Sequence, residues 1–181
     1  QVKGDPALLL AFVLAGWARD VVAQPPVSVS SAEGLAPALV DRLYLHRDQG
    51  DNLVRSRNLL EERLRADSGD GEALWRLGRT LVRLGEAAAS KKEKAGLYAK
   101  AEAAAYRAAE LLPKNAEAAY WAGVALGRKG QSQGLVSSAF MIKPIQRRMA
   151  QVLAIDPGHG RAHLVLGEMY RRLPAALGGS R

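Results

Sequence analysis

Apolar residues recur every three or four positions through most of the chain, and residues typical of turns separate the segments with this spacing. Such a period places apolar side chains along one face of an α-helix. Between residues 35 and 48, for example, they form a single stripe before Gly50 ends the pattern. The expected helices cover residues 35–48, 52–66, 72–89, 91–112, 116–129, 144–155 and 161–172.

The segment before Pro144 departs from this pattern. A proline in the first turn of a helix costs no hydrogen bond, because the N–H groups there have no partner within the helix. We therefore expect a helix to begin at Pro144. Residues 131–142 are expected to form a short additional helix or an ordered loop whose apolar side chains pack against the domain.

A longer period is superimposed on the helical one. Gly78, Gly123 and Gly167 each follow a Leu or Ala, and they lie 45 and 44 residues apart. Pro113 and Pro157, which are expected to end helices, are also separated by 44 residues. A fixed period of this length is typical of stacked supersecondary units. The predicted fold is all-α, a right-handed solenoid of helical hairpins with extended repeats of 44–45 residues.

The chain is expected to have three parts. Residues 1–24 contain Lys3, an apolar run from residue 7 to residue 18 and small residues before Gln24, which is typical of a signal peptide and predicts a periplasmic or secreted protein. A structural N-terminal helix in a cytoplasmic protein is the alternative. Residues 25–34 have the Pro- and Ser-rich composition of a linker. Residues 35–181 form the repeat domain, with its last repeat incomplete.

The repeated positions resemble the tetratricopeptide repeat (TPR) family, whose signature is W-x2-L-G-x2-Y…A-x3-F-x2-A-x4-P. The Leu-Gly pairs match, as do Tyr170 and the series Ala101, Ala105, Ala108 and Pro113. Leu, Ala or Met mostly replace the aromatic residues of the signature. The resemblance implies a scaffold in which one side of the first helix of each hairpin lines a concave groove.

Residues 119–130 and 137–174 carry a narrower resemblance. They look like extended-hairpin TPR proteins of the TRAP-transporter T-component-like group and, more distantly, like the regulators of microtubule dynamics. The first group implies a periplasmic accessory protein of a transport system. Its members are often anchored through a lipid-modified Cys, and this chain contains no Cys.

The charge of the chain indicates what kind of partner it attracts. Its formal net charge is +8, and between residues 118 and 167 six basic residues stand against one acidic residue. Such a surface favours acidic partners. No recognisable nucleic-acid motif accompanies the basic residues, so nucleic acid is not expected, and a solvated basic face is the favoured interpretation of this local excess. The expected partner is a partner protein or acidic peptide segment, because arginine side chains can bind carboxylates through two parallel hydrogen bonds. The absence of Cys excludes disulfides, thiolate metal sites and thiol nucleophiles.

The sequence predicts no catalytic residue, metal site or cofactor. Its three histidines are His46, His159 and His163. The last two are four residues apart, a spacing at which two imidazoles can share a metal ion, but no acidic residue follows at ligand spacing. A structural role is therefore favoured for them. No nucleophile elbow, zinc-protease or phosphate-loop motif occurs, so an enzyme is not expected.

Counting from the repeated glycines predicts which residues line the groove. The first helices of successive hairpins contribute aromatic and arginine residues, which are enriched at protein interfaces. The predicted binding residues are Trp75, Arg79, Arg83, Tyr120, Val124, Arg128, Leu164, Arg171 and Arg172. The alternative is that Trp75, Tyr120 and Trp121 fill the core between repeats, because an error of one residue in helical register exchanges the two positions.

Two functions remain open from the sequence. The first is a non-catalytic scaffold that binds a partner protein or peptide in the groove lined by arginine and aromatic residues. The second is a periplasmic accessory protein that holds a small ligand for a transport system, in a pocket lined by residues such as Trp75 and Tyr120.

Overall fold

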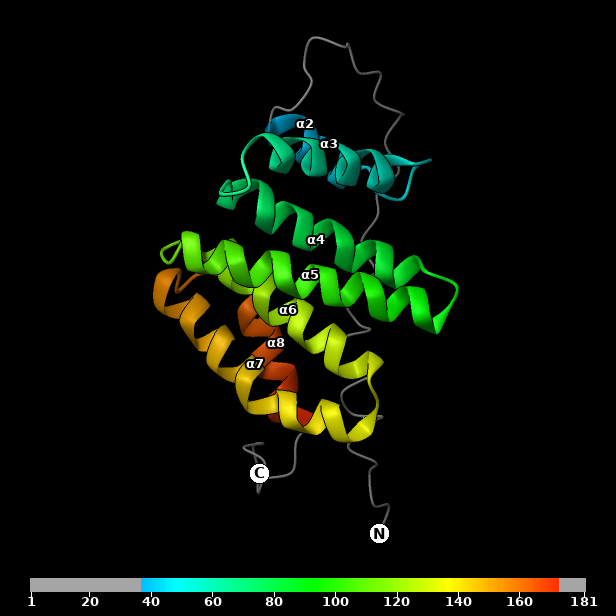
Figure 1. Ribbon diagram of the computed structural model, residues 1–181. Helices are drawn as coiled ribbons and strands as arrows, with labels where there is room; N and C mark the ends of the chain where they lie inside the picture. Colours follow the sequence, from blue (N-terminus) through cyan, green and yellow to red (C-terminus); the bar gives the residue numbers. More distant parts are fainter. Residues whose placement is uncertain (1–36, 173–181) are drawn as a thin grey trace.

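The computed structural model describes residues 37–172, which are helical with short connecting turns and contain no strand (Figure 1). The signal-like segment 1–24 and the linker 25–34 lie outside the described residues. No helix within residues 37–172 has both the length and the apolar character needed to cross a membrane. The helices are α2 (Pro37–Leu45), α3 (Asn52–Ala66), α4 (Gly71–Ala87), α5 (Lys91–Leu111), α6 (Ala116–Ser132), α7 (Leu135–Ile155) and α8 (Gly160–Arg172).

Short side chains fix where the central helices begin. Asp70, Ser90 and Asn115 each accept a hydrogen bond from the backbone N–H three residues further on, at 2.9, 3.1 and 3.1 Å. These bonds satisfy N–H groups that have no partner within the helix. Glu72 and Glu117 add negative charge in the first turns of α4 and α6, where the helix dipole favours it.

Consecutive helices pack against each other, so α2–α3, α4–α5 and α6–α7 form hairpins. Figure 1 shows the hairpins stacked in chain order from α2–α3 through α4–α5 to α6–α7, with α8 behind α7. The first helices of the three hairpins, α2, α4 and α6, also contact one another directly. The all-α prediction is confirmed, and the first helices come together along one side of the stack.

Two of the repeated glycines, Gly78 and Gly123, lie at the contact between the two helices of a hairpin. A Cβ on Gly78 would meet the Cβ of Ala105 at 2.9 Å, and a Cβ on Gly123 would clash with Cε of Met149. Glycine at these positions therefore lets α5 and α7 approach closely. A Cβ on Gly167 would meet no atom within 4 Å, because no described helix packs against that side of α8.

The core runs through the stack from α4 to α8. Trp121, Tyr120 and Met149 are among its largest fully buried side chains. A smaller cluster joins α2, α3 and α4, and beside it the buried hydroxyl groups of Ser56 and Thr80 share a hydrogen bond of 3.2 Å. Hydrophobic burial of this kind, rather than helix propensity alone, holds the hairpins together.

The prediction that a helix begins at Pro144 is wrong. The helix α7 runs without interruption from Leu135 to Ile155, with Pro144 inside it, and residues 135–142 are its first turns rather than a separate element. The reason lies in packing, because buried apolar side chains continue at helical spacing across the proline. They are Ile142, Ile145, Met149 and Val152. The loss of one backbone hydrogen bond costs less than the loss of this stripe.

Two helix ends also differ from prediction. Gly130 was expected to end α6, but it lies buried inside the helix, which continues to Ser132. The helix α2 ends at Leu45, and a turn that includes Gly50 at φ 51° leads into α3. The glycine conformation at this turn lets the chain reverse within a few residues.

Candidate functional site

Acidic, arginine and aromatic side chains form a connected set along the first helices of the hairpins. We call this set the arginine–aromatic network. Its members are Asp41 and Tyr44 on α2; Glu72, Trp75, Arg76, Arg79, Arg83 and Glu86 on α4; Glu117, Tyr120, Trp121 and Arg128 on α6; and His159 and Arg161 at the start of α8.

Arg79 lies at the centre of the network. Its Nη2 donates a hydrogen bond of 2.6 Å to Oδ1 of Asp41, and its guanidinium carbon lies 3.8 Å from the centre of the Tyr44 ring. Arg76 donates to the other oxygen of Asp41 at 3.0 Å and to Glu72 at 2.5 Å. Burial by itself would raise the pKa of Asp41, but the two arginines hold that pKa below its ordinary value. The carboxylate of α2 thus fastens α2 to α4.

Glu86 joins the next pair of helices. Arg83 donates to Oε2 of Glu86 at 2.8 Å and to the hydroxyl of Tyr44 at 3.1 Å. Nη2 of Arg128 lies 2.5 Å from Oε1 of Glu86. One carboxylate on α4 therefore pairs with two arginines, one on its own helix and one on α6.

The acidic residues of the first turns repeat the same contact in successive hairpins. Asn115 donates to Oε1 of Glu72 at 2.8 Å, from the residue just before α6. His159 Nε2 lies 3.3 Å from Oε1 of Glu117, from the residue just before α8, and Arg161 pairs with the same oxygen. Each first-turn glutamate thus holds the beginning of the next hairpin's first helix.

Each of these glutamates also accepts a hydrogen bond from an indole. Trp75 Nε1 donates to Glu72 at 2.8 Å, and Trp121 Nε1 donates to Glu117 at 3.1 Å. Trp121 further contacts the edge of the Tyr44 ring, with ring centres 6.3 Å apart, although α2 and α6 belong to hairpins that are not consecutive. Side chains of the protein itself therefore occupy the space between the first helices.

The predicted binding residues on α4 and α6 are parts of this network or of the core. Arg79 and Arg128 are 8% and 7% exposed, and both are paired with carboxylates. Trp75, Tyr120 and Val124 are buried in the main core cluster, as the core alternative for Trp75 and Tyr120 expected. Arg83, which is half-buried, also lines a cavity. The role of these residues in binding a partner stays a prediction.

The predicted residues on α8 are placed differently. Leu164 is 58% exposed, and Arg171 is exposed and donates to Glu168 at 2.6 Å. Arg172 lies at the end of the helix, and the structure does not describe its side chain. The structure brings Trp75, Arg79, Arg83 and Arg128 into one network with α2 but leaves Leu164 and Arg171 apart from it.

The residues predicted by counting from the repeated glycines do not include the acidic members of the arginine–aromatic network. The missed carboxylates are those of Asp41, Glu72, Glu86 and Glu117. A usable signal existed for two of them, because Glu72 and Glu117 are separated by 45 residues, as Gly78 and Gly123 are. The period alone does not indicate that these glutamates contact the next hairpin.

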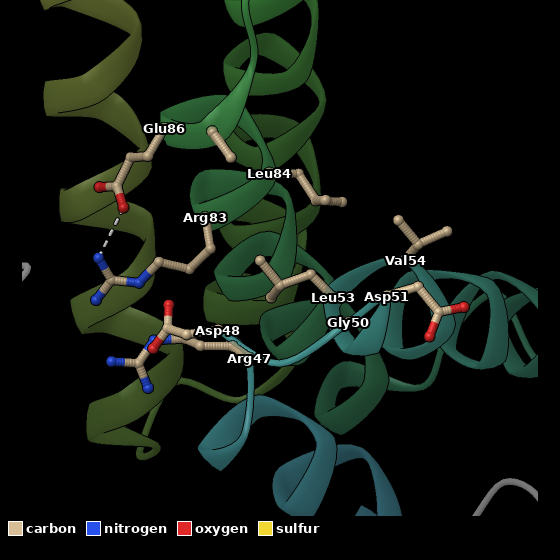
Figure 2. A pocket seen from close by; sticks show the side chains of 10 residues that line it. Arg47, Asp48, Gly50, Asp51, Leu53, Val54, Arg83, Leu84 and Glu86 are labelled. Atoms are coloured by element: carbon tan, nitrogen blue, oxygen red, sulfur yellow. Dashed lines mark hydrogen bonds and ion pairs between the residues drawn. The ribbon is translucent and has the colours of Figure 1, made fainter. Parts of the chain in front are cut away.

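A cavity of about 420 Å³ opens where the α2–α3 turn meets the end of α4. Figure 2 shows Arg47, Arg83 and Glu86 on one side of it and Leu84 and Val54 on the other. The remaining lining residues are Asp48, Gly50, Asp51, Leu53 and Ala87. A cavity lined by both charged and apolar side chains can hold a small amphipathic group, but this lining contains neither a hydroxyl, thiol or imidazole nucleophile nor a histidine base.

Two of the histidines have structural partners. His159 Nδ1 accepts a hydrogen bond from the backbone N–H of Ala162 at 3.2 Å, so its Nε2 carries the proton that faces Glu117. His163 is exposed, and its Nε2 lies 2.7 Å from the carbonyl oxygen of Pro157. Within residues 37–172 no three or more His, Cys, Asp or Glu side chains are grouped in a way that could hold a metal ion.

Comparison with known families matches this fold to one family. The family model described as "Regulator of microtubule dynamics protein 1-3" matches residues 38–171, which extend from α2 through α8. Comparison with curated proteins finds no match to the chain.

The match corrects the family assignment. The assignment to the TPR family, near the TRAP-transporter T-component-like group, is wrong, because the matching family is a different one. From the sequence alone, the chain resembled the transport-linked group more closely than the regulators of microtubule dynamics. The match reverses that order. The transport function rested on the rejected assignment and is not retained. The chain belongs to the regulator of microtubule dynamics protein 1-3 family.

Proposed function

We propose that the chain is a non-catalytic scaffold that binds a partner protein through an acidic segment of that partner. The description of its family names the regulation of microtubule dynamics, and acting on an assembled protein polymer is a task for proteins that bind other proteins. Layered helical hairpins suit this role, because they present extended surfaces to a partner.

The observation that carries the acidic partner is how the positive charge is distributed. The network arginines are paired with carboxylates inside the chain, as Arg79 is with Asp41 and Arg128 is with Glu86. The net charge is nevertheless +8. Exposed basic side chains that have no acidic partner among the described residues contribute to this excess, and Lys143 and Arg147 are two of them. A surface of this kind raises the rate and strength of encounter with acidic partners.

The arrangement of ionisable groups supports a non-catalytic role. Catalysis needs a nucleophile, an acid–base pair or a metal held in a pocket. His159 accepts a hydrogen bond from the backbone N–H of Ala162 at the start of α8, and Nε2 of His163 lies within hydrogen-bond distance of the backbone carbonyl of Pro157. The cavity beside Arg83 has no histidine in its lining.

A binding assay with defined peptides tests the proposal. The acidic probe is a fluorescein-labelled peptide of about 15 residues, composed of glutamate with a few leucines, and the control is the same peptide with lysine in place of glutamate. We expect fluorescence anisotropy to show binding of the acidic probe at low salt, weakening as salt is raised toward about 0.5 M. Failure to bind the acidic probe, or equal binding of the lysine peptide, would contradict the proposal.

Microtubules are the first protein assembly to test as a partner, because the family description names their dynamics. The measurement is co-sedimentation of the purified chain with polymerised microtubules at low and high salt. Recovery of the chain in the pellet at low salt would support direct binding. A chain that stays in the supernatant while it binds the acidic probe would exclude microtubules as the direct partner.

A further inference from the structure

The helix α7 has two different faces. Its buried face consists of Ile142, Ile145, Met149 and Val152. On the opposite side of the helix, at the same spacing of three or four residues, the side chains are all exposed. We call this exposed side the α7 stripe, and its members are Phe140, Lys143, Arg147, Ala150 and Ala154. Figure 1 shows α7 along an outer edge of the stack.

No acidic side chain of α7 itself balances the positive charge of the α7 stripe. The 21 residues of α7 include three basic residues and no acidic one. Lys143 and Arg147 are one helical turn apart, so their cationic groups can reach the same partner segment. Neither has an acidic partner among the described residues. On α5, by contrast, the exposed Arg107 pairs with Glu110 on its own helix at 3.6 Å.

The third basic residue of α7 is held in place beside the stripe. The guanidinium carbon of Arg148 lies 4.7 Å from the centre of the Tyr106 ring on α5, and its Nη1 donates to Gln151 at 3.0 Å. These contacts hold Arg148 against the body of the protein. The charges of α7 that are exposed to a partner are therefore those of Lys143 and Arg147.

The ends of the stripe differ in size. Phe140, at the N-terminal end, is 71% exposed, which is unusual for a large apolar side chain. Ala150 and Ala154, at the other end, leave the backbone of a partner free to approach closely. Aromatic residues, Phe among them, and Arg are enriched at protein interfaces relative to the rest of the surface.

We propose that the α7 stripe is the docking site for the acidic segment of the partner protein. Carboxylates of the segment contact Lys143 and Arg147, an apolar residue of the segment covers Phe140, and the segment continues over Ala150 and Ala154. The stripe is about 21 Å long, so a helical segment of about 15 residues covers it. This inference rests on the proposed function and names the surface that performs it.

The composition of the stripe favours a polypeptide over the other anionic surfaces. Stable attachment to a membrane needs a larger apolar face or a cluster of several basic residues. Binding to duplex nucleic acid commonly uses six to ten phosphate contacts. Two cations with one aromatic anchor match a short acidic peptide that carries an apolar residue.

Matched surface variants of the whole chain test the site. K143E/R147E reverses the two charges of the stripe, and K91E/K92E reverses two exposed lysines at the start of α5. The charge change is the same in both, so any general effect of net charge is shared. Phe140→Ser removes the apolar anchor without touching the charge. Because all five residues are exposed, each variant should keep the wild-type helicity and melting temperature, which circular dichroism checks.

The readout is the affinity for the acidic probe peptide. We expect K143E/R147E to weaken it by roughly 10- to 100-fold, Phe140→Ser by roughly 5- to 30-fold, and K91E/K92E by less than about threefold. If wild-type protein binds the probe and K143E/R147E binds it within about twofold of wild type, the stripe is not the site. Equal losses in the two double variants would also overturn it.

Two further outcomes distinguish failure of this inference from failure of the proposed function on which it rests. Absence of probe binding by the wild-type chain contradicts the proposed function itself. Tighter binding of wild-type protein to vesicles with anionic headgroups, or to duplex DNA, than to the probe peptide would contradict the choice of a polypeptide as the occupant. Tighter binding to the peptide, lost in K143E/R147E, supports it.

Discussion

The guanidinium of Arg79 is held between Asp41, whose Oδ1 is 2.6 Å from its Nη2, and the ring of Tyr44, whose centre is 3.8 Å away. Asp41 lies 38 residues earlier in the chain and one hairpin away. Because Arg79 is 8% exposed, its charge depends on this carboxylate for compensation. The contact therefore joins the first hairpin to the second.

Removing the carboxylate should loosen this junction. We expect Asp41→Ala to lower the free energy of unfolding by about 1–3 kcal/mol, because Arg79 is then left buried without its partner; the upper end is reduced by the partial exposure of Asp41. Urea unfolding followed by circular dichroism measures it. Arg107→Ala, at the exposed pair with Glu110, should change stability by less than about 0.5 kcal/mol. Equal effects would show that the junction contributes no more than a surface ion pair.

Acid should weaken the same junction. Burial opposes the charge of Asp41 and of Asp70, but hydrogen bonds from Arg76, Arg79, Arg63 and the backbone hold both pKa values below the ordinary 3.8. A depressed pKa in the folded state contributes stability that is complete above the ordinary value and is lost as pH falls through the folded value.

We therefore expect the free energy of unfolding to fall between about pH 5 and pH 2. Asp41→Asn combined with Asp70→Asn should be less stable than wild type at neutral pH, and its stability should depend less on pH over this range. The asparagine that replaces Asp70 can still cap α4, so the fold is preserved. A double variant with the wild-type acid dependence would show that other carboxyl groups are responsible.

The glycines of the repeat should respond differently to the same substitution. We expect Gly78→Ala to lower the free energy of unfolding by about 1–3 kcal/mol, because the added methyl group meets Ala105 at 2.9 Å and the carbonyl oxygen of Ala101 at 3.2 Å. Gly167→Ala should raise it by about 0.5–1 kcal/mol, because the new methyl group meets nothing within 4 Å and alanine favours helix. Thermal unfolding of the two variants measures both changes, and a stabilising Gly78→Ala would contradict the close packing of α4 on α5.

The local features of this fold could be predicted from the sequence, because they depend on near neighbours in the chain. The cap at Asn115 and the turns that separate the hairpins are determined within a few residues. The period of the glycines then predicted equivalent points in successive hairpins, and Gly78 and Gly123 both lie where the two helices of their own hairpin pack together. Repetition supplied this longer-range information.

The side-chain partners of the network could not be predicted in the same way. Arg128 has the spacing of a groove residue, but whether it faces a partner or the protein depends on Glu86, which lies 42 residues earlier on another helix. Periodicity places each residue on a face of its own helix, and it does not determine which charges on neighbouring helices meet. The burial of Tyr120 depends likewise on His159 and Arg161 of the next hairpin.

Substitution of Pro144 distinguishes two interpretations of α7, a continuous helix and a helix that begins at Pro144. Inside a continuous helix, proline lacks the N–H that would donate to the carbonyl of residue 140, so Pro144→Ala should restore that bond and raise the free energy of unfolding by about 1–3 kcal/mol. If instead a helix began at Pro144, the substitution would restore no bond and would cost about 0.4–1 kcal/mol, because alanine leaves the unfolded chain more freedom. Pro157→Ala, in the exposed turn before α8, is the control. It should lose stability for the same reason, because alanine leaves the unfolded chain more freedom. Urea unfolding of both variants measures the difference, and a loss of stability in Pro144→Ala equal to that in Pro157→Ala would contradict the continuous helix.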